Sequence, residues 1–197
     1  MSAVLNAPPL TLEAYMLWEA QQPERHEFVA GEIYAMTGAR ATHNTIAGNI
    51  FLLLKQSLRG TPCRIFISDM KLHVASADAS FYPDVFVSCD PRDRMPDAEL
   101  VQRHPQLVVE VLSDSTAAFD RGPKFEAYRS LDSLAAYLIV EQHRPHADLF
   151  IRNAEGLWVL NPAGQGGTLK IPSMGVELPM AAVYEGVAFD VKARGAT

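Results

Sequence analysis

The segment 106-QLVVEVLSDST-116 places one glutamate, Glu110, inside an otherwise apolar run. A short run of this kind, rich in β-branched residues, is typical of a central strand covered on both faces. Burying a carboxylate costs roughly several kcal/mol unless a cation or hydrogen-bond donors replace the lost water. We therefore expect Glu110 to lie on a solvated face or to have a partner.

The size and composition of the chain indicate one globular domain. Its 197 residues, 48% of them hydrophobic, suffice for a substantial core. We expect a flexible leader at 1–10, a single domain at 11–190 and a tail at 191–197. No apolar stretch approaches the roughly 20 residues of a membrane span, and the N-terminus lacks the features of a signal peptide. These observations predict a cytoplasmic protein with no membrane association.

The cysteine content and the net charge exclude some classes of function. Cys63 and Cys89 are the only cysteines, too few and too widely spaced for a thiolate metal site or a disulfide framework. We expect them to be small buried hydrophobic residues. Lys and Arg number 17 against 23 Asp and Glu, and the net charge of −6 argues against broad electrostatic capture of nucleic acid. A local basic cleft, or a metal ion that offsets clustered carboxylates, remains compatible with this charge.

Periodicity and capping signals predict alternating helices and strands. Helices are expected at 11–22, with Thr11 as N-cap, at 43–60, and from Pro123 onward. The segment 64–76 alternates in its second half, which predicts one half-exposed strand. Other segments expected to form strands are 25–38, with a turn at Ala30-Gly31, 82–90, 107–112 and 133–141, and several after residue 146, whereas 90–105 is expected to be a surface loop. This order predicts an α/β fold with a central mixed sheet flanked by helices and extra C-terminal strands.

Two carboxylates are expected to converge on neighbouring strands. Asp84 belongs to the predicted strand before that of Glu110, and consecutive strands are usually neighbours in space. A divalent cation between them would remove their mutual repulsion, and oxygen ligands favour Mg²⁺ or Mn²⁺. Asp120, Lys124 and Tyr128 recur at helical spacing and so share a face, from which Lys124 can reach the strand ends.

These residues in their contexts resemble a known family. YPDVFV, LVVEVLS, the spaced set Asp120, Lys124 and Tyr128, and HEFVAGEIYAMTG followed by His43 are similar to motifs of the putative restriction endonuclease family. That family belongs to the PD-(D/E)XK nuclease superfamily. The resemblance runs from about residue 11 to about residue 185.

The resemblance implies a restriction-endonuclease-like fold and a metal-dependent endonuclease, most simply one that uses Mg²⁺ to cleave DNA. It implies metal binding by Asp84, Glu110 and the backbone carbonyl of Val111. The lysine of the superfamily motif would fall at position 112, which is Leu112, and the matching lysine here is Lys124. Hydrolysis of a phosphodiester would follow from a polarised phosphoryl oxygen and an activated water. A homodimer is expected as well, since cutting both strands requires two sites.

Alternatives remain open at each position. Glu110 can instead form a structural salt bridge, and Lys124 can be a solvated helix lysine. Glu27, at the family's early glutamate position, adds a carboxylate to the site or is surface charge. Three further candidates can instead have purely structural roles, as capping, pairing or core residues: His43, Asp120 and Tyr128. At the level of the whole protein, the alternatives are an inactive nucleic-acid-binding relative and a non-nuclease protein with structural carboxylates.

Overall fold

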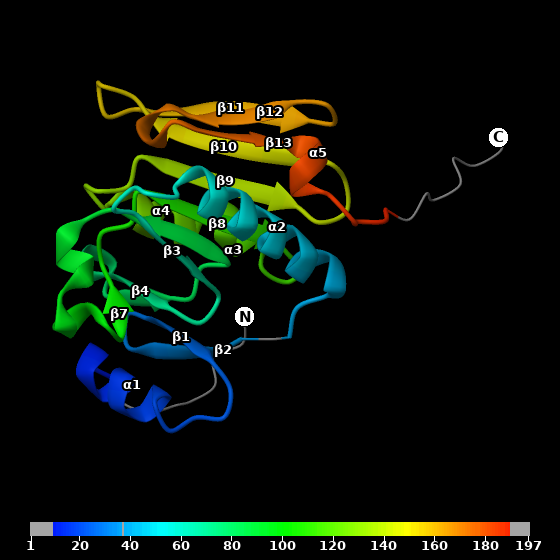
Figure 1. Cartoon of the computed structure of the whole chain (residues 1–197). Helices are drawn as coiled ribbons and strands as arrows, with labels where there is room; N and C mark the ends of the chain where they lie inside the picture. Colours follow the sequence, from blue (N-terminus) through cyan, green and yellow to red (C-terminus); the bar gives the residue numbers. More distant parts are fainter. Residues whose placement is uncertain (1–9, 37, 190–197) are drawn as a thin grey trace.

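The computed structural model describes residues 10–36 and 38–189, so the expected leader, apart from Leu10, and the expected tail lie outside the described residues (Figure 1). The helices are α1 (Leu12–Glu19), α2 (Ala41–Ser57), α3 (Ala117–Arg121), α4 (Pro123–Arg129) and α5 (Met180–Val183). The strands are β1 (His26–Val29), β2 (Glu32–Ala35), β3 (Arg64–Ile67), β4 (Lys71–Val74), β5 (Ala79–Phe81), β6 (Val85–Ser88), β7 (Val101–Gln102), β8 (Leu107–Leu112), β9 (Ala136–Glu141), β10 (His146–Arg152), β11 (Trp158–Gly164), β12 (Thr168–Ile171) and β13 (Val176–Pro179). None of the helices in these ranges is both long and apolar enough to cross a membrane.

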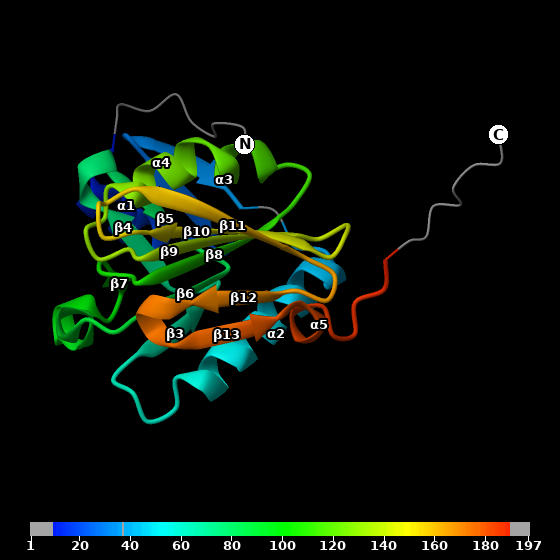
Figure 2. The same ribbon diagram turned by 90° about the horizontal axis from the view of Figure 1, so that it is seen from above.

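Six strands form a central mixed sheet in the order β11-β10-β9-β8-β6-β3. Only the β8–β9 pair is parallel, and the other pairs are antiparallel. One face packs against α2, the β12–β13 hairpin and α5, and the other packs against α3 and α4 (Figure 2). The predicted mixed sheet with helices on both faces and extra C-terminal strands is confirmed.

A second sheet, which was not predicted, has the order β2-β1-β5-β4-β7. It packs on the α4 side of the central sheet, so that residues of β4 and β5 share a core with α4. Helix α1 covers part of it, with the Tyr15 ring stacked on Phe28 and packed beside Ile33. The two larger sheets therefore share one apolar layer, to which α4 contributes.

Strand β8 is buried along its whole length, as its apolar run predicts. Val109 and Val111 belong to the core on the α2 side, while Val108 and Leu112 belong to the core shared with the second sheet. Because side chains alternate along a strand, Glu110 points to the same side as Val108 and Leu112. It is only 3% exposed, which excludes a solvated face.

Local signals near the N-terminus gave the expected elements. Thr11 caps α1 by accepting a hydrogen bond from the N–H of Ala14 at 3.2 Å. The β1–β2 hairpin turns at Ala30 and Gly31, whose φ angles are 49° and 87°. Two-residue hairpin loops favour positive φ at both positions because this geometry fits the right-handed twist of the strands.

The segment 64–76 is not one strand. Ser68, at a φ of 45°, breaks it into β3, at the edge of the central sheet, and β4, inside the second sheet. The predicted half-exposed face is wrong for the same reason, because β4 lies between β5 and β7 and His73 is buried. The His73 ring nitrogen Nδ1 lies 2.8 Å from the carbonyl oxygen of Ala79.

The predicted surface loop at 90–105 is more ordered than expected. It contains two 3-10 turns (Pro91–Arg94 and Pro96–Ala98) and the short strand β7. Asp93 is buried there and accepts hydrogen bonds from the hydroxyl of Ser88 and from the backbone of Arg103 and His104. One buried carboxylate thus organises the loop.

The two cysteines form a disulfide, which corrects the prediction of two unpaired cysteines. They are 26 residues apart in sequence, but the β3–β6 register pairs Arg64 with Ser88 and leaves Cys63 and Cys89 directly opposed. Both are half-buried. Sequence spacing misled the prediction because antiparallel pairing, rather than chain distance, brings the two thiols together.

Candidate active site

Asp84 lies directly before β6, next to the strand β8 that carries Glu110. Strands β6 and β8 are antiparallel with Val85 opposite Val109, so Asp84 and Glu110 occupy the next opposed positions. The Val111 N–H donates to Oδ2 of Asp84 at 2.7 Å, which fixes this carboxylate against the backbone next to Glu110. The two residues of the prediction thus lie at neighbouring positions of the fold, with Asp84 held against the backbone next to Glu110.

Lys124 is a buried cation surrounded by carboxylates, and not a solvated lysine. Its Nζ lies 3.0 Å from Oε1 of Glu110, 3.0 Å from Oε1 of Glu27 and 3.5 Å from Oδ1 of Asp120. All four side chains are at most 6% exposed. The structure thus brings together four residues that the sequence singled out separately.

The position of Lys124 depends on a break in the helical segment. The predicted single helical face is divided at Gly122, which separates α3, with Asp120, from α4, with Lys124 and Tyr128. The three side chains still converge because the two short helices pack on the same face of the central sheet. Leu112, at the position of the superfamily lysine, is instead buried in the core. Lys124 reaches Glu110 from α4.

Glu27 enters the site from the second sheet. Its Oε1 accepts a hydrogen bond from the N–H of Tyr82 at 3.2 Å in addition to the contact with Lys124. Its Oε2 is buried and has no hydrogen-bond partner among the described residues. Sequence reasoning missed Tyr82, since a backbone donor can belong to any residue type. The one sequence feature that could have indicated Tyr82 is its position two residues before Asp84.

Two tyrosines complete the buried side of the site. Tyr128 donates a hydrogen bond to Oε1 of Glu110 at 3.0 Å, and Tyr137 donates one to the backbone carbonyl of Asp120 at 2.9 Å. Both rings are fully buried. Tyr128 is therefore both a core residue and a direct partner of Glu110, whereas Tyr137 was not singled out from the sequence.

His43, in the first turns of α2, contacts the more accessible carboxylate. Its Nε2 lies 3.2 Å from Oδ2 of Asp84, and the two side chains are 14% and 17% exposed. Burial lowers the pKa of His43, but hydrogen bonds to Asp84 and to the backbone of Val111 raise it above its usual value. A protonated His43 is therefore the cation that pairs with Asp84.

The buried cluster carries more negative than positive charge. Burial raises the pKa of Glu110 well above its usual range; Lys124 opposes this effect, while Asp120, Asp84 and Glu27 add to it. For Lys124, burial lowers the pKa, but Glu110 and Glu27 outweigh burial and raise it well above its usual value. Lys124 therefore stays charged, and Glu110 tends to hold a proton unless another cation is present.

The oxygen donors fit a hard divalent cation that keeps part of its water shell. In the described part of the chain, no three His, Cys, Asp or Glu side chains form a ready-made metal cage. Mg²⁺ does not need one, because it usually binds one or two carboxylates and retains several waters. Asp84 and Glu110 would supply such a pair; burial is the main cause of the raised pKa of Glu110, and the neighbouring carboxylates add to it. The residues that would hold the ion are Asp84, Glu110 and the carbonyl of Val111.

Two histidines with ligand-like spacing do not join this site. His143 lies in the β9–β10 turn, with its Nε2 2.8 Å from Oδ1 of Asp114. His146 opens β10 and contacts Asp148 at 3.1 Å. Each is paired with a separate carboxylate, so they do not form a shared metal site.

Comparison with known proteins gives a consistent result. Residues 12–181 match the model of a family described as "Putative restriction endonuclease". One uncharacterised protein of Synechocystis sp. is 38% identical over 182 residues, covering 92% of this chain and 95% of its own length. A second from the same organism is 34% identical over 160 residues, covering 81% and 90%.

The fold is also similar to a solved structure. A putative nuclease of the DUF820 family from Anabaena variabilis superposes with a TM-score of 0.71, at 14% identity, over 89% of this chain and 98% of that chain. At this identity the likeness concerns the fold, and it confirms the predicted fold class.

Proposed function

Since the chain belongs to the putative restriction endonuclease family, as its motifs predicted, we propose that it is a metal-dependent endonuclease that hydrolyses phosphodiester bonds in DNA. The observation that carries the proposal is the arrangement of Asp84, Glu110 and Lys124. Asp84 is held by the N–H of the residue that follows Glu110, and a buried lysine lies 3.0 Å from Glu110 itself. Mg²⁺ or Mn²⁺ held there would lower the pKa of a coordinated water and polarise the phosphoryl oxygen.

The residues of the chain have distinct tasks in this proposal. Asp84 and Glu110 would bind the cation, and the Val111 N–H would keep Asp84 oriented toward it. Lys124 would orient the attacking water or neutralise charge that develops on the phosphate. Glu27 and Asp120 would hold the Lys124 ammonium in place from two further directions. His43, at the accessible side, would pair with Asp84 and present a cation toward the substrate.

The test is a plasmid-nicking assay with Mg²⁺ or Mn²⁺. Wild type should nick supercoiled DNA, whereas Asp84→Ala and Glu110→Ala should not. Glu177→Ala, at an exposed carboxylate in the β12–β13 hairpin, provides the matched control and should be fully active. Equal nicking by all four proteins would show that the activity comes from a contaminant.

A second candidate is a relative that binds nucleic acid without cutting it. Leu112 at the position of the superfamily lysine favours this candidate, because a lysine from another helix need not hold its ammonium in the same place. Isothermal titration with Mn²⁺ and DNA-binding measurements separate the candidates. Metal and DNA binding without nicking supports the inactive relative, and absence of both supports structural carboxylates.

The proposal extends to assembly and substrate geometry. Cleavage of both strands of a duplex requires two active sites, so we expect a homodimer on DNA. Sedimentation velocity with and without a duplex measures this directly. A protein that remains monomeric on DNA should nick single strands and leave double-strand breaks rare.

A further inference from the structure

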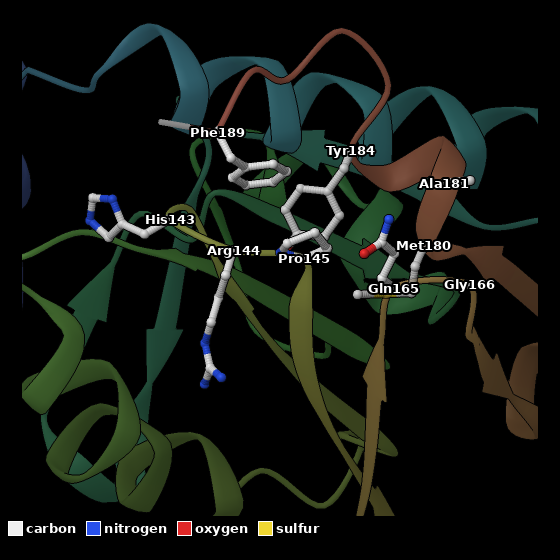
Figure 3. Close-up of a pocket in the computed structure, with 9 residues that line it drawn as sticks. All are labelled: His143, Arg144, Pro145, Gln165, Gly166, Met180, Ala181, Tyr184 and Phe189. Carbon is white, nitrogen blue, oxygen red and sulfur yellow. The ribbon is translucent and has the colours of Figure 1, made fainter. Parts of the chain in front are cut away.

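A pocket of about 420 Å³ lies away from the carboxylates, at one end of the central sheet. It is bounded by the β9–β10 turn, the β11–β12 turn, and α5 with the segment that follows it (Figure 3). Its volume falls within the range of roughly 300–1,000 Å³ typical of small-molecule sites. None of its lining residues has a task in the proposed hydrolysis.

The wall of the pocket is aromatic and held in place. The Tyr184 hydroxyl donates to the carbonyl of Glu141 at 2.7 Å, accepts from the N–H of His146 at 3.2 Å, and lies 2.9 Å from the His146 carbonyl. Phe189 lies beside it, with ring centroids 5.4 Å apart, and Pro145 lies close to both rings (Figure 3). Tyr184 is only 7% exposed and belongs to the core on the α2 side, so it holds Phe189 in place, and the more accessible Phe189 ring is the one that can serve as a stacking surface.

The rim of the pocket is polar and exposed. Gln165, in the β11–β12 turn, offers an amide with two donors and one acceptor. Arg144 and His143 stand on the opposite turn; Arg144 lies 3.9 Å from Glu141, and His143 is paired with Asp114. An apolar aromatic wall with an amide and a guanidinium at its edge suits a planar heterocycle that carries a phosphate.

The pocket lies on the α2 side of the central sheet, at the end toward which β8 runs beyond Glu110. Strands β8 and β9 are parallel with Glu110 beside Ile139, and at about 3.3 Å per residue the β9–β10 turn begins roughly 10 Å beyond that pair. A chain of contacts bridges the distance. His143 pairs with Asp114, and Asp114 contacts Arg40, which precedes α2. The same helix carries His43, the partner of Asp84.

We propose that this pocket binds an unpaired nucleobase of the nucleic-acid strand that occupies the active site. The inference rests on the proposed function and adds a substrate class to it, namely strands with an unpaired or extruded base close to the scissile phosphate. Phe189, backed by the buried Tyr184 ring, supplies the stacking surface, Gln165 contacts the base edge, and Arg144 contacts a flanking phosphate. A fully paired duplex presents no free base and leaves the pocket unused.

The test measures binding of a fluorescent single-stranded oligonucleotide and of the matched blunt duplex by anisotropy, in EDTA and with Ca²⁺. Removing one stacking partner should weaken single-strand binding about tenfold, so Phe189→Ala is expected to do so while duplex binding stays unchanged. Gln165→Ala, on an exposed turn where folding is not at risk, should weaken single-strand binding severalfold. Leu157→Ala, an exposed apolar change elsewhere, and Gln56→Ala, an exposed amide on α2, serve as matched controls and should have no effect.

The outcomes separate the pocket from the proposed function. If wild type nicks plasmid and both pocket variants bind single strands as tightly as wild type, the base-binding role of the pocket is wrong and the proposed nuclease function stands. Absence of both nicking and oligonucleotide binding in wild type overturns both. Equal loss of single-strand and duplex binding assigns the residues to backbone contact and overturns the base site. Saturation of the pocket by free dAMP, with no competition from the oligonucleotide, assigns it to a free nucleotide and overturns the strand-bound proposal.

Discussion

The ammonium of Lys124 lies 3.0 Å from Oε1 of Glu110, and neither side chain is more than 6% exposed. This contact explains how a glutamate is accommodated inside a buried strand. It also links α4 to β8 by a charge that water does not screen. The pair is therefore central to both the stability and the proposed chemistry of the protein.

Removing the lysine should be costly to stability. Lys124→Met leaves Glu110, Glu27 and Asp120 without their buried cation, and loss of one partner of a buried pair costs about 3–5 kcal/mol. Urea unfolding at neutral pH measures the change. Lys170→Met removes an exposed pair with Glu177 and should change stability by less than about 1 kcal/mol. Similar losses in the two variants would mean that Lys124 is not a buried counterion.

The tyrosine that donates to Glu110 should matter more than its neighbour. Tyr128→Phe removes a hydrogen bond to an ionisable carboxyl group and should cost about 1.5–3 kcal/mol. Tyr137→Phe, an equally buried control, removes a bond to a neutral carbonyl and should cost about 0.5–1.5 kcal/mol. Thermal unfolding of both variants tests the order. A larger loss for Tyr137→Phe would contradict the charge cluster around Glu110.

Metal affinity should increase with pH. Burial raises the pKa of Glu110, so a cation that takes Glu110 as a ligand must first displace its proton. Binding should therefore weaken as the pH falls through the raised pKa of Glu110. Titration of Mn²⁺ in two buffers with different ionisation enthalpies should show release of a proton. Buffer-independent heats would indicate that Glu110 is already ionised in the metal-free protein.

Metal should stabilise the wild type and not the Glu110 variant. At a free metal concentration of 100 times Kd, wild type should gain about 2.7 kcal/mol of folding stability. Glu110→Gln should keep its fold by circular dichroism and show no such gain. Loss of folding in Glu110→Gln would point instead to a purely structural pairing with Lys124.

The contribution of Asp93, in the 90–105 loop, to folding stability should depend on pH in the acid range. Burial raises the pKa of Asp93, but hydrogen bonds from His104, Ser88 and the backbone outweigh burial and lower it below 3.8. Ionised Asp93 therefore stabilises the fold above pH 3.8, and this contribution is lost as the pH falls through the lowered pKa. Asp93→Asn should cost about 2–3 kcal/mol at pH 7. The difference from wild type should shrink below pH 3.8; a constant difference would exclude ionisation as the cause.

Short-range patterns predicted the individual elements well. Thr11 as a cap, the turn at Ala30-Gly31 and the buried run around Glu110 each depend on a few neighbouring residues, and the structure confirms all three. The division into two sheets was not predictable in this way. It depends on Ser68, a non-glycine residue at positive φ, where the chain leaves one sheet and enters another.

The part of the candidate site that is formed by side chains was predictable from the sequence. Asp84, Glu110 and Lys124 stood out because charged residues beside buried strands need partners, and the structure brings them together. Tyr82 could not be found, since it contributes only its backbone N–H to Glu27. The disulfide was missed because it depends on the pairing of β3 with β6, which has no local signal.

Glu27 belongs to the second sheet and Glu110 to the central sheet, and both are held by the same ammonium of Lys124. A cation that binds Glu110 competes with Lys124 for it and so changes the attraction between the two sheets. Hydrogen exchange at the amides of β1 should therefore respond to metal, although the proposed ligands lie on β8 and directly before β6 and none lies on β1. Metal occupancy of the proposed site could thus be followed by the hydrogen-exchange protection of β1, which belongs to the other sheet.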